Sequence, residues 1–426
     1  MTVTLPDLKA AVGQFFFPSE TQQSQLHFTS ILAEPADNAE TIRHVLDILH
    51  EKHGIGKHIS HLVVAGDAKT YEYLLEAKRV YGEDLNWLLP YLGKWHLLKN
   101  IQAPLMKIYL DAGLRQLLSV LHKGATHVAV ASASGFRKTH IFLMQSWEAM
   151  YREQMAMFCS QNVNSNGDAN LTWKNLYSCV VEKIRSEGSN IFTNLSSERN
   201  ALSPLYLHSC SHYVTLFLAM RLRQFDLRNI SVRNLTPIFH AMDRPTYLKL
   251  VPFHMAAMKQ YPPDILEYFQ KGAFSVSVTG RNGCCFAFDE AHEMLINKEV
   301  KMSMTTTGIG SLSRLVHYLP YRAQLMKTFK SEVTMSKDRM DENDSDSSFK
   351  LTEDNVKLYI DKLKNESNFF RAITTPDSVC HIFTGEVATT AVSNDLKIFY
   401  EKGEEDLNAF ISCVVLNTSG QKPPKR

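Results

Sequence analysis

The sequence predicts a mixed α/β protein that is rich in helices, with a small sheet on which helices pack. Three patterns indicate this fold class. The short β-branched run His61–Gly66 has the composition of a buried strand and ends at a glycine. Apolar residues recur with helical spacing on both sides of this run. Residues 273–279 alternate with a period of two, which is typical of a strand with one buried face.

The first part of the chain predicts strands and helices in alternation, an order typical of a sheet covered by helices. The predicted elements are a weak strand over Leu26–Leu32, a helix over Ala39–His50, a strand over His61–Gly66, a helix over Thr70–Tyr81, a short apolar run at Leu85–Leu89 and a helix over Trp95–Leu114.

The middle of the chain, from Leu117 to Tyr268, predicts an almost wholly helical region. Two polar loops are expected to interrupt it, at Cys159–Asn170 and at Glu187–Ser203. The elements predicted after this region are the strand over 273–279, a hairpin partner over Cys284–Phe288 and a helix over Asp289–Lys298.

Composition excludes several classes of protein. The 426 residues are 44% apolar and 21% charged, so wholesale disorder is excluded. A formal charge of +2 is too balanced to require a nucleic-acid partner. The seven cysteines contain no CxxC pair, which excludes a zinc ribbon or a disulfide framework and favours a reducing compartment. We find no signal peptide and no run long enough for a membrane span, so we expect an intracellular protein, nuclear or cytoplasmic, and neither secreted nor membrane-bound.

Asp67 is the first residue with a predicted chemical role. It follows the strand ending at Gly66, and in α/β sheets ligands bind at the carboxyl ends of strands. A carboxylate there is well placed to hold a metal ion. The alternative is a structural one, in which Asp67 caps the next helix by accepting a hydrogen bond from the Lys69 or Thr70 amide.

A second acidic candidate is the segment Asp289-Glu290-Ala291-His292-Glu293. Asp289 and Glu293 are four residues apart and share one face of a helix. An N-terminal position on that helix explains Asp289 and Glu290, since acidic side chains are favoured in the first turn. It explains His292 and Glu293 less well. A third candidate is Gly93-Lys94-Trp95-His96, where His96 enters a helix and could orient a carboxylate or bind a phosphate.

Three stretches, containing VVAGDAKTYEYLL with GKWHLLKN, MDRPTYLKLVPFH, and AFDEAHEML, together resemble a group of uncharacterised eukaryotic proteins linked to DNA transposons. The resemblance runs from about His27 to beyond Asn417. It implies an RNase H-like core interrupted by a large helical insertion. The implied segments are 20–116 for the first part of the core, 117–270 for the insertion, 271–330 for the second part of the core, 331–350 for an acidic Ser-rich linker, 351–418 for a C-terminal helical segment and 419–426 for a disordered tail.

The resemblance also implies a reaction. Such enzymes hold two Mg²⁺ ions between three carboxylates and cleave or join phosphodiesters. Here Asp67 stands where the second acid is expected, and Glu293, or less favourably Glu290, stands where the last is expected. His96 matches a histidine that often follows the second acid. The metal ligands implied are thus Asp67, Glu293 and Glu290, with Asp67, Glu293 and His96 catalytic.

The first acid of the triad is missing from this pattern. Only 66 residues precede Asp67, Leu26–Leu32 contains no aspartate, and Asp7 and Asp37 lie outside any strand pattern. We therefore expect a short N-terminus and rank a degenerate or incomplete transposase or nuclease above an active one. Two alternatives remain open: a non-catalytic module that binds nucleic acid or protein, and a helical scaffold without a ligand.

Each hypothesis carries its own expectation. The enzyme requires Asp67 and Glu293 to converge. DNA binding would be favoured by a basic face, whose predicted members are Arg221, Arg223, Arg228, Arg233 and Arg244. The scaffold would be favoured if residues 61–66 and 273–279 lay in different sheets. DNA and a second copy of the chain are candidate partners, and no small-molecule substrate is predicted.

Overall fold

The computed structural model describes residues 38–166, 202–242, 244–278, 283–297, 352–365, 380–391 and 398–415, together with a few separate positions such as 22–25. The predicted strand over Leu26–Leu32, the linker over 331–350 and the tail over 419–426 lie largely or wholly outside the described residues. The described residues form a helix-rich α/β protein with small sheets, which confirms the fold class in its coarse form.

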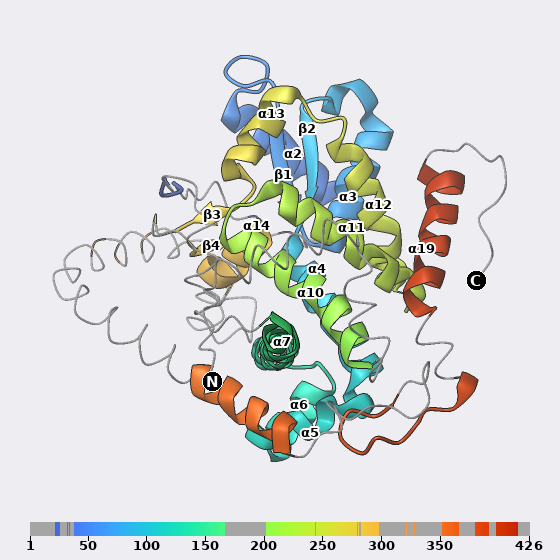
Figure 1. Ribbon diagram of the computed structural model, residues 1–426. Coiled ribbons are helices and arrows are strands. Elements are labelled where there is room, and N and C mark those ends of the chain that lie inside the picture. The colour runs from blue at the N-terminus through green and yellow to red at the C-terminus, as the bar shows by residue number, and fades with distance from the viewer. Residues whose placement is uncertain are drawn as a thin grey trace. The chain divides into compact units, whose positions relative to one another are not determined.

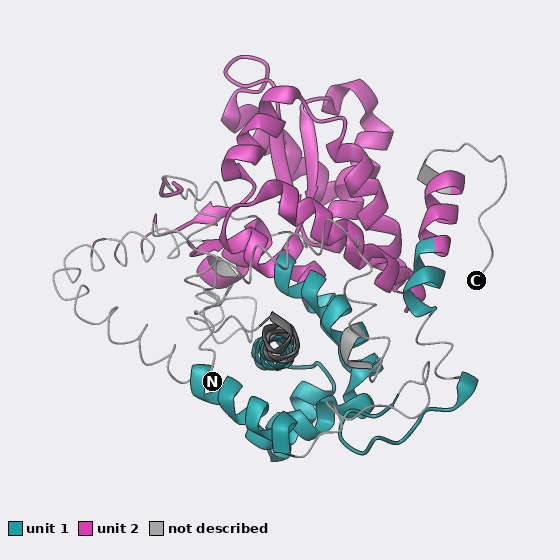
Figure 2. Cartoon of the chain, in the orientation of Figure 1, with its two compact units in different colours: residues 1–15, 99–215, 346–404 teal, residues 16–98, 216–345, 405–426 magenta. Residues whose placement is uncertain are grey.

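The chain divides into two compact units, shown in teal and magenta in Figure 2. One unit contains residues 1–15, 99–215 and 346–404, and the other contains 16–98, 216–345 and 405–426. Both units are discontinuous in sequence, and their boundaries differ from the predicted segment ends at 116 and 270. We refer to them as unit 1 and unit 2, and all the predicted site residues belong to unit 2.

The first described helix of unit 2 is α2, Ala39–His53. The Asn38 side chain caps it by accepting a hydrogen bond of 2.7 Å from the Thr41 amide. Gly54 ends it in the left-handed conformation with φ 57°, which a residue without Cβ adopts readily. The helix thus runs past the predicted end at His50 until a glycine allows it to stop.

A strand–helix–strand motif follows, made of β1 (Leu62–Gly66), α3 (Ala68–Tyr81) and β2 (Leu88–Leu92). The two strands are parallel, with Leu62 opposite Leu88 and Gly66 opposite Leu92. A short 3-10 turn at Gly82–Leu85 separates α3 from β2. The strand–helix alternation is therefore as predicted, but the second strand starts three residues later than the run at Leu85–Leu89. Figure 1 shows β1 and β2 side by side.

Apolar side chains bury the motif on two sides. Leu46 of α2, Leu74 of α3 and Leu88 of β2 belong to one buried cluster. Leu89 and Tyr91, which point to the other face of β2, belong to a second. The second cluster is completed by Phe225, Met258, Tyr261, Phe269 and Phe274.

Phe225 belongs to helix α11 (Phe225–Ala241) and Met258 to α12 (Pro245–Met258), and Tyr261 lies between α12 and α13 (Pro263–Tyr268). Phe269 begins the π-helical turn Phe269–Ala273 that follows α13, and Phe274 comes directly after it. Helix α12 packs on β2 and on α3. The Tyr261 hydroxyl donates a hydrogen bond of 2.5 Å to the Pro90 carbonyl and so joins this helical layer to the strand.

The alternating residues 273–279 contain one strand of a small hairpin. Strand β3 (Val276–Ser277) pairs antiparallel with β4 (Cys285–Phe286), so the predicted hairpin partner is confirmed. The paired part of β3 is much shorter than the seven-residue alternation. The Ser24 amide donates a hydrogen bond of 2.7 Å to the Ser277 carbonyl on the outer side of β3. Among the described residues, β1–β2 and β3–β4 form separate sheets.

After the hairpin, α14 (Phe288–His292) leads into a single π-helical turn, Glu293–Asn297. Helix α14 packs against β1. The helix predicted over Asp289–Lys298 is therefore present, with its second half wound as a π-helix.

Helix α4 (Lys94–Tyr109) begins in unit 2 and ends in unit 1. Helix α10 (Leu202–Arg221) begins in unit 1 and ends in unit 2. The other unit 1 elements include α5 (Arg115–Leu121), α6 (Gly124–Ala131), α7 (Phe136–Asn166) and a helix over 352–365. Helix α19 (Phe399–Phe410) lies near the C-terminus.

All described elements between Arg115 and Tyr268 are helices, so the predicted helical region is confirmed where it is described. The predicted loop at Cys159–Asn170 is wrong in its first half, because α7 continues to Asn166. Residues 187–201 lie outside the described part. No helix in the described part of the chain combines the length and apolar character needed to cross a membrane.

Candidate functional site

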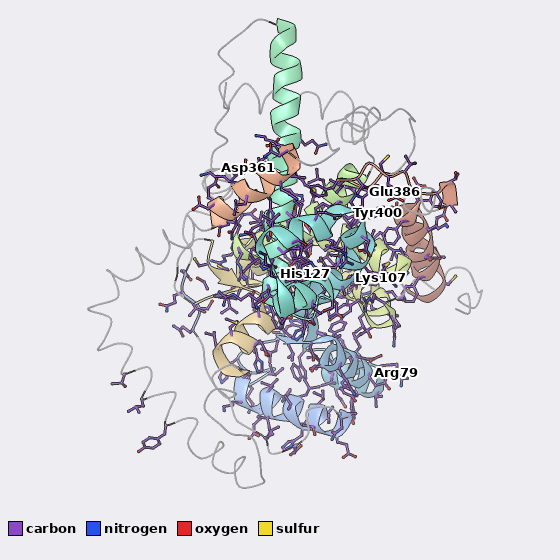
Figure 3. The ribbon with its side chains drawn as sticks, turned by 90° about the horizontal axis from the view of Figure 1, so that it is seen from below. Arg79, Lys107, His127, Asp361, Glu386 and Tyr400 are labelled. Atoms are coloured by element: carbon purple, nitrogen blue, oxygen red, sulfur yellow. The ribbon has the colours of Figure 1, made fainter. Side chains whose placement is uncertain are left out.

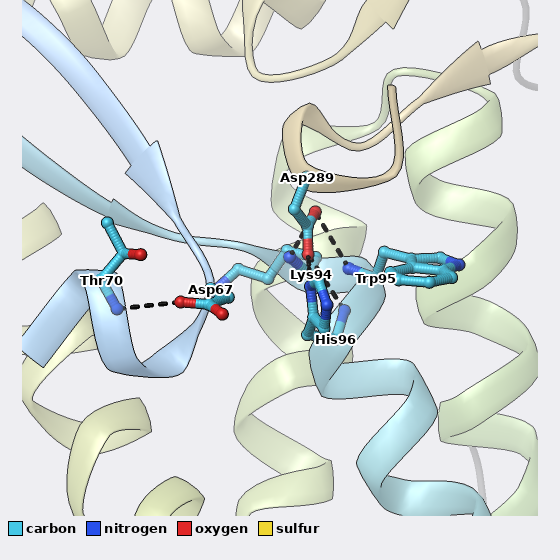
Figure 4. Close-up of polar contacts among 6 residues, drawn as sticks. All are labelled: Asp67, Thr70, Lys94, Trp95, His96 and Asp289. Carbon is cyan, nitrogen blue, oxygen red and sulfur yellow. Dashed lines mark hydrogen bonds and ion pairs between the residues drawn. The ribbon is translucent and has the colours of Figure 1, made fainter. Parts of the chain in front are cut away.

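The start of helix α4 is the point where the predicted motifs meet. The Asp289 side chain, from the first turn of α14, reaches the amides that open α4. Its Oδ1 accepts hydrogen bonds from the Lys94 and Trp95 amides at 3.1 and 3.2 Å. Its Oδ2 accepts from the His96 amide and from His96 Nδ1, each at 3.0 Å. Figure 4 shows these contacts.

These bonds satisfy the open end of α4. The first amides of a helix have no partner within the helix and need acceptors from elsewhere. The Gly93 amide donates to the Gly66 carbonyl at 2.8 Å, and Asp289 serves the next three. A carboxylate also interacts favourably with the positive end of the helix dipole. Asp289 is thus the N-terminal cap of α4, supplied by a distant part of the chain.

Gly93 allows this close approach. A Cβ atom at this position would lie 2.6 Å from Asp289 Cγ, a distance that side chains do not tolerate. Glycine is required at position 93 because a Cβ atom would overlap the Asp289 side chain, and not because the backbone has a positive φ.

The Asp289 side chain is 5% exposed, and burial alone would raise the pKa of its carboxyl group. The His96 side chain and the His96 and Trp95 amides outweigh burial, so the pKa of Asp289 lies below its ordinary value. The carboxylate is therefore charged at neutral pH. Because the charged carboxylate accepts, His96 Nδ1 carries the proton in this pair.

Glu290, the next residue, is held by an arginine. Arg221 Nη2 contacts Glu290 Oε1 at 2.5 Å, and Arg221 Nη1 donates to the Cys285 carbonyl at 2.6 Å. The guanidinium also lies over the rings of Phe217 and Phe286, at 4.6 and 4.8 Å from their centroids. This ion pair fixes α14 and β4 to the end of α10.

Asp67 has the structural role that the sequence left open. Its Oδ1 accepts a hydrogen bond of 2.8 Å from the Thr70 amide, which makes it the cap of α3. Figure 4 shows this cap beside the one formed by Asp289. Glu293 begins the π-helical turn and is partly buried. The convergence of Asp67 and Glu293 on a shared metal stays a prediction.

The acids at the start of α14 are engaged by other protein groups. The four acceptor positions of Asp289 are filled by protein donors, so it has none left for a metal. Glu290 is paired with Arg221, and one Asp67 oxygen is bound by Thr70. Among the described residues, no group of three or more His, Cys, Asp or Glu side chains could hold a metal ion.

The predicted basic face is not a set of free cations. Arg228 is fully buried, so its predicted place on this basic face is wrong. Arg221 is paired with Glu290, and Arg223 donates to the Gly272 carbonyl at 3.2 Å. Arg233 is exposed and Arg244 is partly buried. The five residues therefore differ in environment and do not form one surface.

The role of Asp289 at α4 was missed by sequence reasoning, which considered it only for its own helix. The two partners are 193 to 195 residues apart, so no local spacing connects them. The weak signal was that α4 begins at Gly-Lys-Trp-His without a Ser, Thr, Asp or Asn before its first turn. Such a helix requires a cap from elsewhere.

No curated protein and no solved structure matches this chain. A family model described as a domain of unknown function (DUF8702) matches residues 13–423, nearly the whole sequence. The chain therefore belongs to the DUF8702 family.

Proposed function

We propose that this chain is a transposon-derived, RNase H-like protein that no longer cleaves phosphodiesters, and that its acidic residues now hold the fold together. The observation that carries the proposal is that Glu290, one of the implied metal ligands, is paired with Arg221, next to an Asp289 carboxylate that accepts from four donors at the start of α4. A carboxylate used in this way is unavailable to a metal.

The arrangement of the segments supports the ancestry in this proposal. Asp67 follows a strand of a parallel pair, and α14, which carries Asp289 and Glu290, packs against that same strand. Residues that stand for the second and the last acid of the implied triad thus belong to elements that are neighbours in unit 2. The pairing of Glu290 with Arg221 supports the loss of chemistry, because removal of a ligand from a two-metal site removes most of its activity.

A DNA-cleavage assay tests the loss of chemistry. Supercoiled and linear DNA would be incubated with the full chain in Mg²⁺ or Mn²⁺, and compared with Asp67→Asn and Glu293→Gln. Asparagine is as good a helix cap as aspartate, so Asp67→Asn removes the charge while keeping the start of α3. We expect no cleavage by any of the three proteins. Metal-dependent cleavage by the wild type that Asp67→Asn abolishes would overturn the proposal.

A scaffold function is the second candidate, and one observation favours it. Strands β1 and β3 lie in separate sheets among the described residues, whereas a continuous core sheet would join them. A scaffold without nucleic acid would show no salt-dependent DNA binding in fluorescence anisotropy. Binding that weakens steeply with salt would instead favour a DNA-binding descendant of the transposase.

A further inference from the structure

A cluster of polar side chains lies in the core of unit 2, away from solvent. Its members are Lys94, Arg228, His254, Tyr71 and Tyr91, and each is at most 1% exposed. They come from α4, α11, α12, α3 and β2. Buried polar groups are normally paired, so such a cluster requires an explanation.

The five side chains are in contact around Tyr91 and His254. The Arg228 guanidinium carbon lies 5.1 Å from the Tyr91 ring centroid, and Lys94 Nζ lies 5.5 Å from the same point. The His254 ring centroid is 5.2 Å from that of Tyr91 and 5.7 Å from that of Tyr71. The members therefore form one continuous group.

The hydrogen bonds in this group leave donors unused. Arg228 Nη2 lies 3.0 Å from His254 Nε2, and because arginine can only donate, this histidine nitrogen accepts. The proton of the neutral imidazole then resides on Nδ1. In the described part of the chain, His254 Nδ1, Lys94 Nζ and the Tyr71 hydroxyl are buried without a hydrogen-bond partner, whereas the Tyr91 hydroxyl interacts with Arg228.

These unpaired atoms share one chemical character. The two nitrogens can donate, and the Tyr71 hydroxyl can donate as well as accept. None of the five side chains carries a negative charge to pair with the Arg228 cation. A buried donor without an acceptor destabilises the folded chain.

The charges of the group also indicate that an anion would be bound favourably. Arg228 is a buried cation, and the buried amine of Lys94 belongs to the same cluster. Burial, together with the charge of Arg228, holds the pKa of Lys94 well below its ordinary value, and Asp289 only partly offsets this. The Asp289 oxygens are already occupied by α4 and supply no hydrogen bond to the lysine amine.

We propose that the Lys94–Arg228–His254 cluster, with the hydroxyls of Tyr71 and Tyr91, is a binding site for a small tetrahedral oxyanion such as inorganic phosphate. Such an ion provides the missing negative charge and enough oxygen acceptors for several donors. Full burial of the side chains selects a small ion over the backbone of a nucleic acid. The ion enters during folding or by local opening, and its exchange is therefore slow. This site is independent of the proposed function, because none of its residues is among the predicted metal ligands.

Thermal unfolding of the full chain tests this site. The protein would be prepared in chloride buffer and unfolded in phosphate, sulfate, acetate or chloride at equal ionic strength. Phosphate at ten times its Kd should raise the folded-to-unfolded ratio about eleven-fold. Sulfate should act in the same direction. An effect of acetate equal to that of phosphate would overturn the tetrahedral specificity, and no anion effect beyond that of chloride would overturn the site.

Paired variants locate the effect. Lys94→Met and Arg228→Met should lose the stabilisation by phosphate. Lys107→Met, on the exposed part of the same helix as Lys94, and Arg233→Met, on the exposed face of the same helix as Arg228, should keep it. Figure 3 labels Lys107. If Lys94 only fills space as a neutral amine, Lys94→Met will be more stable than the wild type in every salt, and this result contradicts the proposal.

A second measurement does not depend on the folding of any variant. Because exchange is slow, desalted wild-type protein should release about one equivalent of a tetrahedral oxyanion when it is denatured in acid, as measured by ion chromatography. After refolding in chloride alone, the released anion should disappear and the phosphate-dependent stabilisation should remain. A wild-type protein that neither releases such an anion nor responds to one has no site of this kind.

Discussion

Asp289 and His96 are 193 residues apart in the sequence and are joined by two hydrogen bonds of 3.0 Å, one to the His96 amide and one to its Nδ1 atom. Asp289 also accepts hydrogen bonds from the Lys94 and Trp95 amides. This one carboxylate therefore caps the first turn of α4. A residue that sequence patterns associate with metal chemistry thus has a structural role that can be measured.

Replacement of Asp289 by alanine should destabilise unit 2 by about 3 kcal/mol, because it leaves several amides in or near the core without an acceptor. Urea unfolding measures this loss. Hydrogen exchange should quicken at the amides of residues 94–96 before it does so elsewhere. Asp264→Ala, which removes an exposed acid from the first turn of α13, is the matched control and should change little. Equal effects of the two variants would contradict the role of Asp289.

The contribution of Asp289 should depend on pH. Its native pKa lies below the ordinary value of 3.8, so its charged form is favoured by folding. The resulting stability is complete above pH 3.8 and is lost as the pH falls through the lower native pKa. The stability difference between wild type and Asp289→Asn, measured by urea unfolding from pH 7 to pH 2.5, should therefore be constant near neutrality and shrink in acid. A difference that grows in acid would have the wrong sign.

Gly93→Ala should destabilise unit 2 by about 2 kcal/mol, because the new methyl group overlaps Asp289 and must displace it. If this is the mechanism, the two sites are coupled. The double variant Gly93→Ala, Asp289→Ala should then lose less stability than the sum of the single variants. Strict additivity in this double-mutant cycle would show that the methyl group acts through another contact.

The cap formed by Asp67 makes a separate prediction. Asp67→Ala should cost about 1 kcal/mol, because the Thr70 amide loses its acceptor at the start of α3. Asp67→Asn should cost little, since asparagine caps helices equally well. Thermal unfolding compares the three proteins. A large loss in the asparagine variant would mean that the negative charge itself has a role beyond capping.

The elements of unit 2 near the N-terminus could be predicted because their signals are local. Helical spacing before and after an apolar β-branched run indicated α2, β1 and α3, and only their ends shifted. The end of α2 moved to His53 because Gly54 supplies the left-handed residue that stops it. Composition misled at α7, where the polar residues around Asn162 and Asn164 indicated a loop but remain helical. Propensity is a weak preference that the surrounding structure can override.

The candidate site was less predictable because its contacts are distant in sequence. The spacing of residues 289–293 indicated only that they share a helix, and carried no information about α4. The burial of Arg228 follows from the packing of α11 on the aromatic side chains of the second cluster, where Tyr91 and Phe225 face the guanidinium. An arginine in an amphipathic helix gives no local indication of such a position.

The central claim is that the acidic residues of unit 2 serve the fold and not a divalent metal. Titration of the full chain with Mn²⁺, followed through the electron paramagnetic resonance signal of the free ion, tests it most directly. We predict that wild type and Asp67→Asn reduce the signal equally, through weak surface binding alone. One or two equivalents of tightly bound Mn²⁺ in the wild type, lost in Asp67→Asn and Glu293→Gln, would contradict the account.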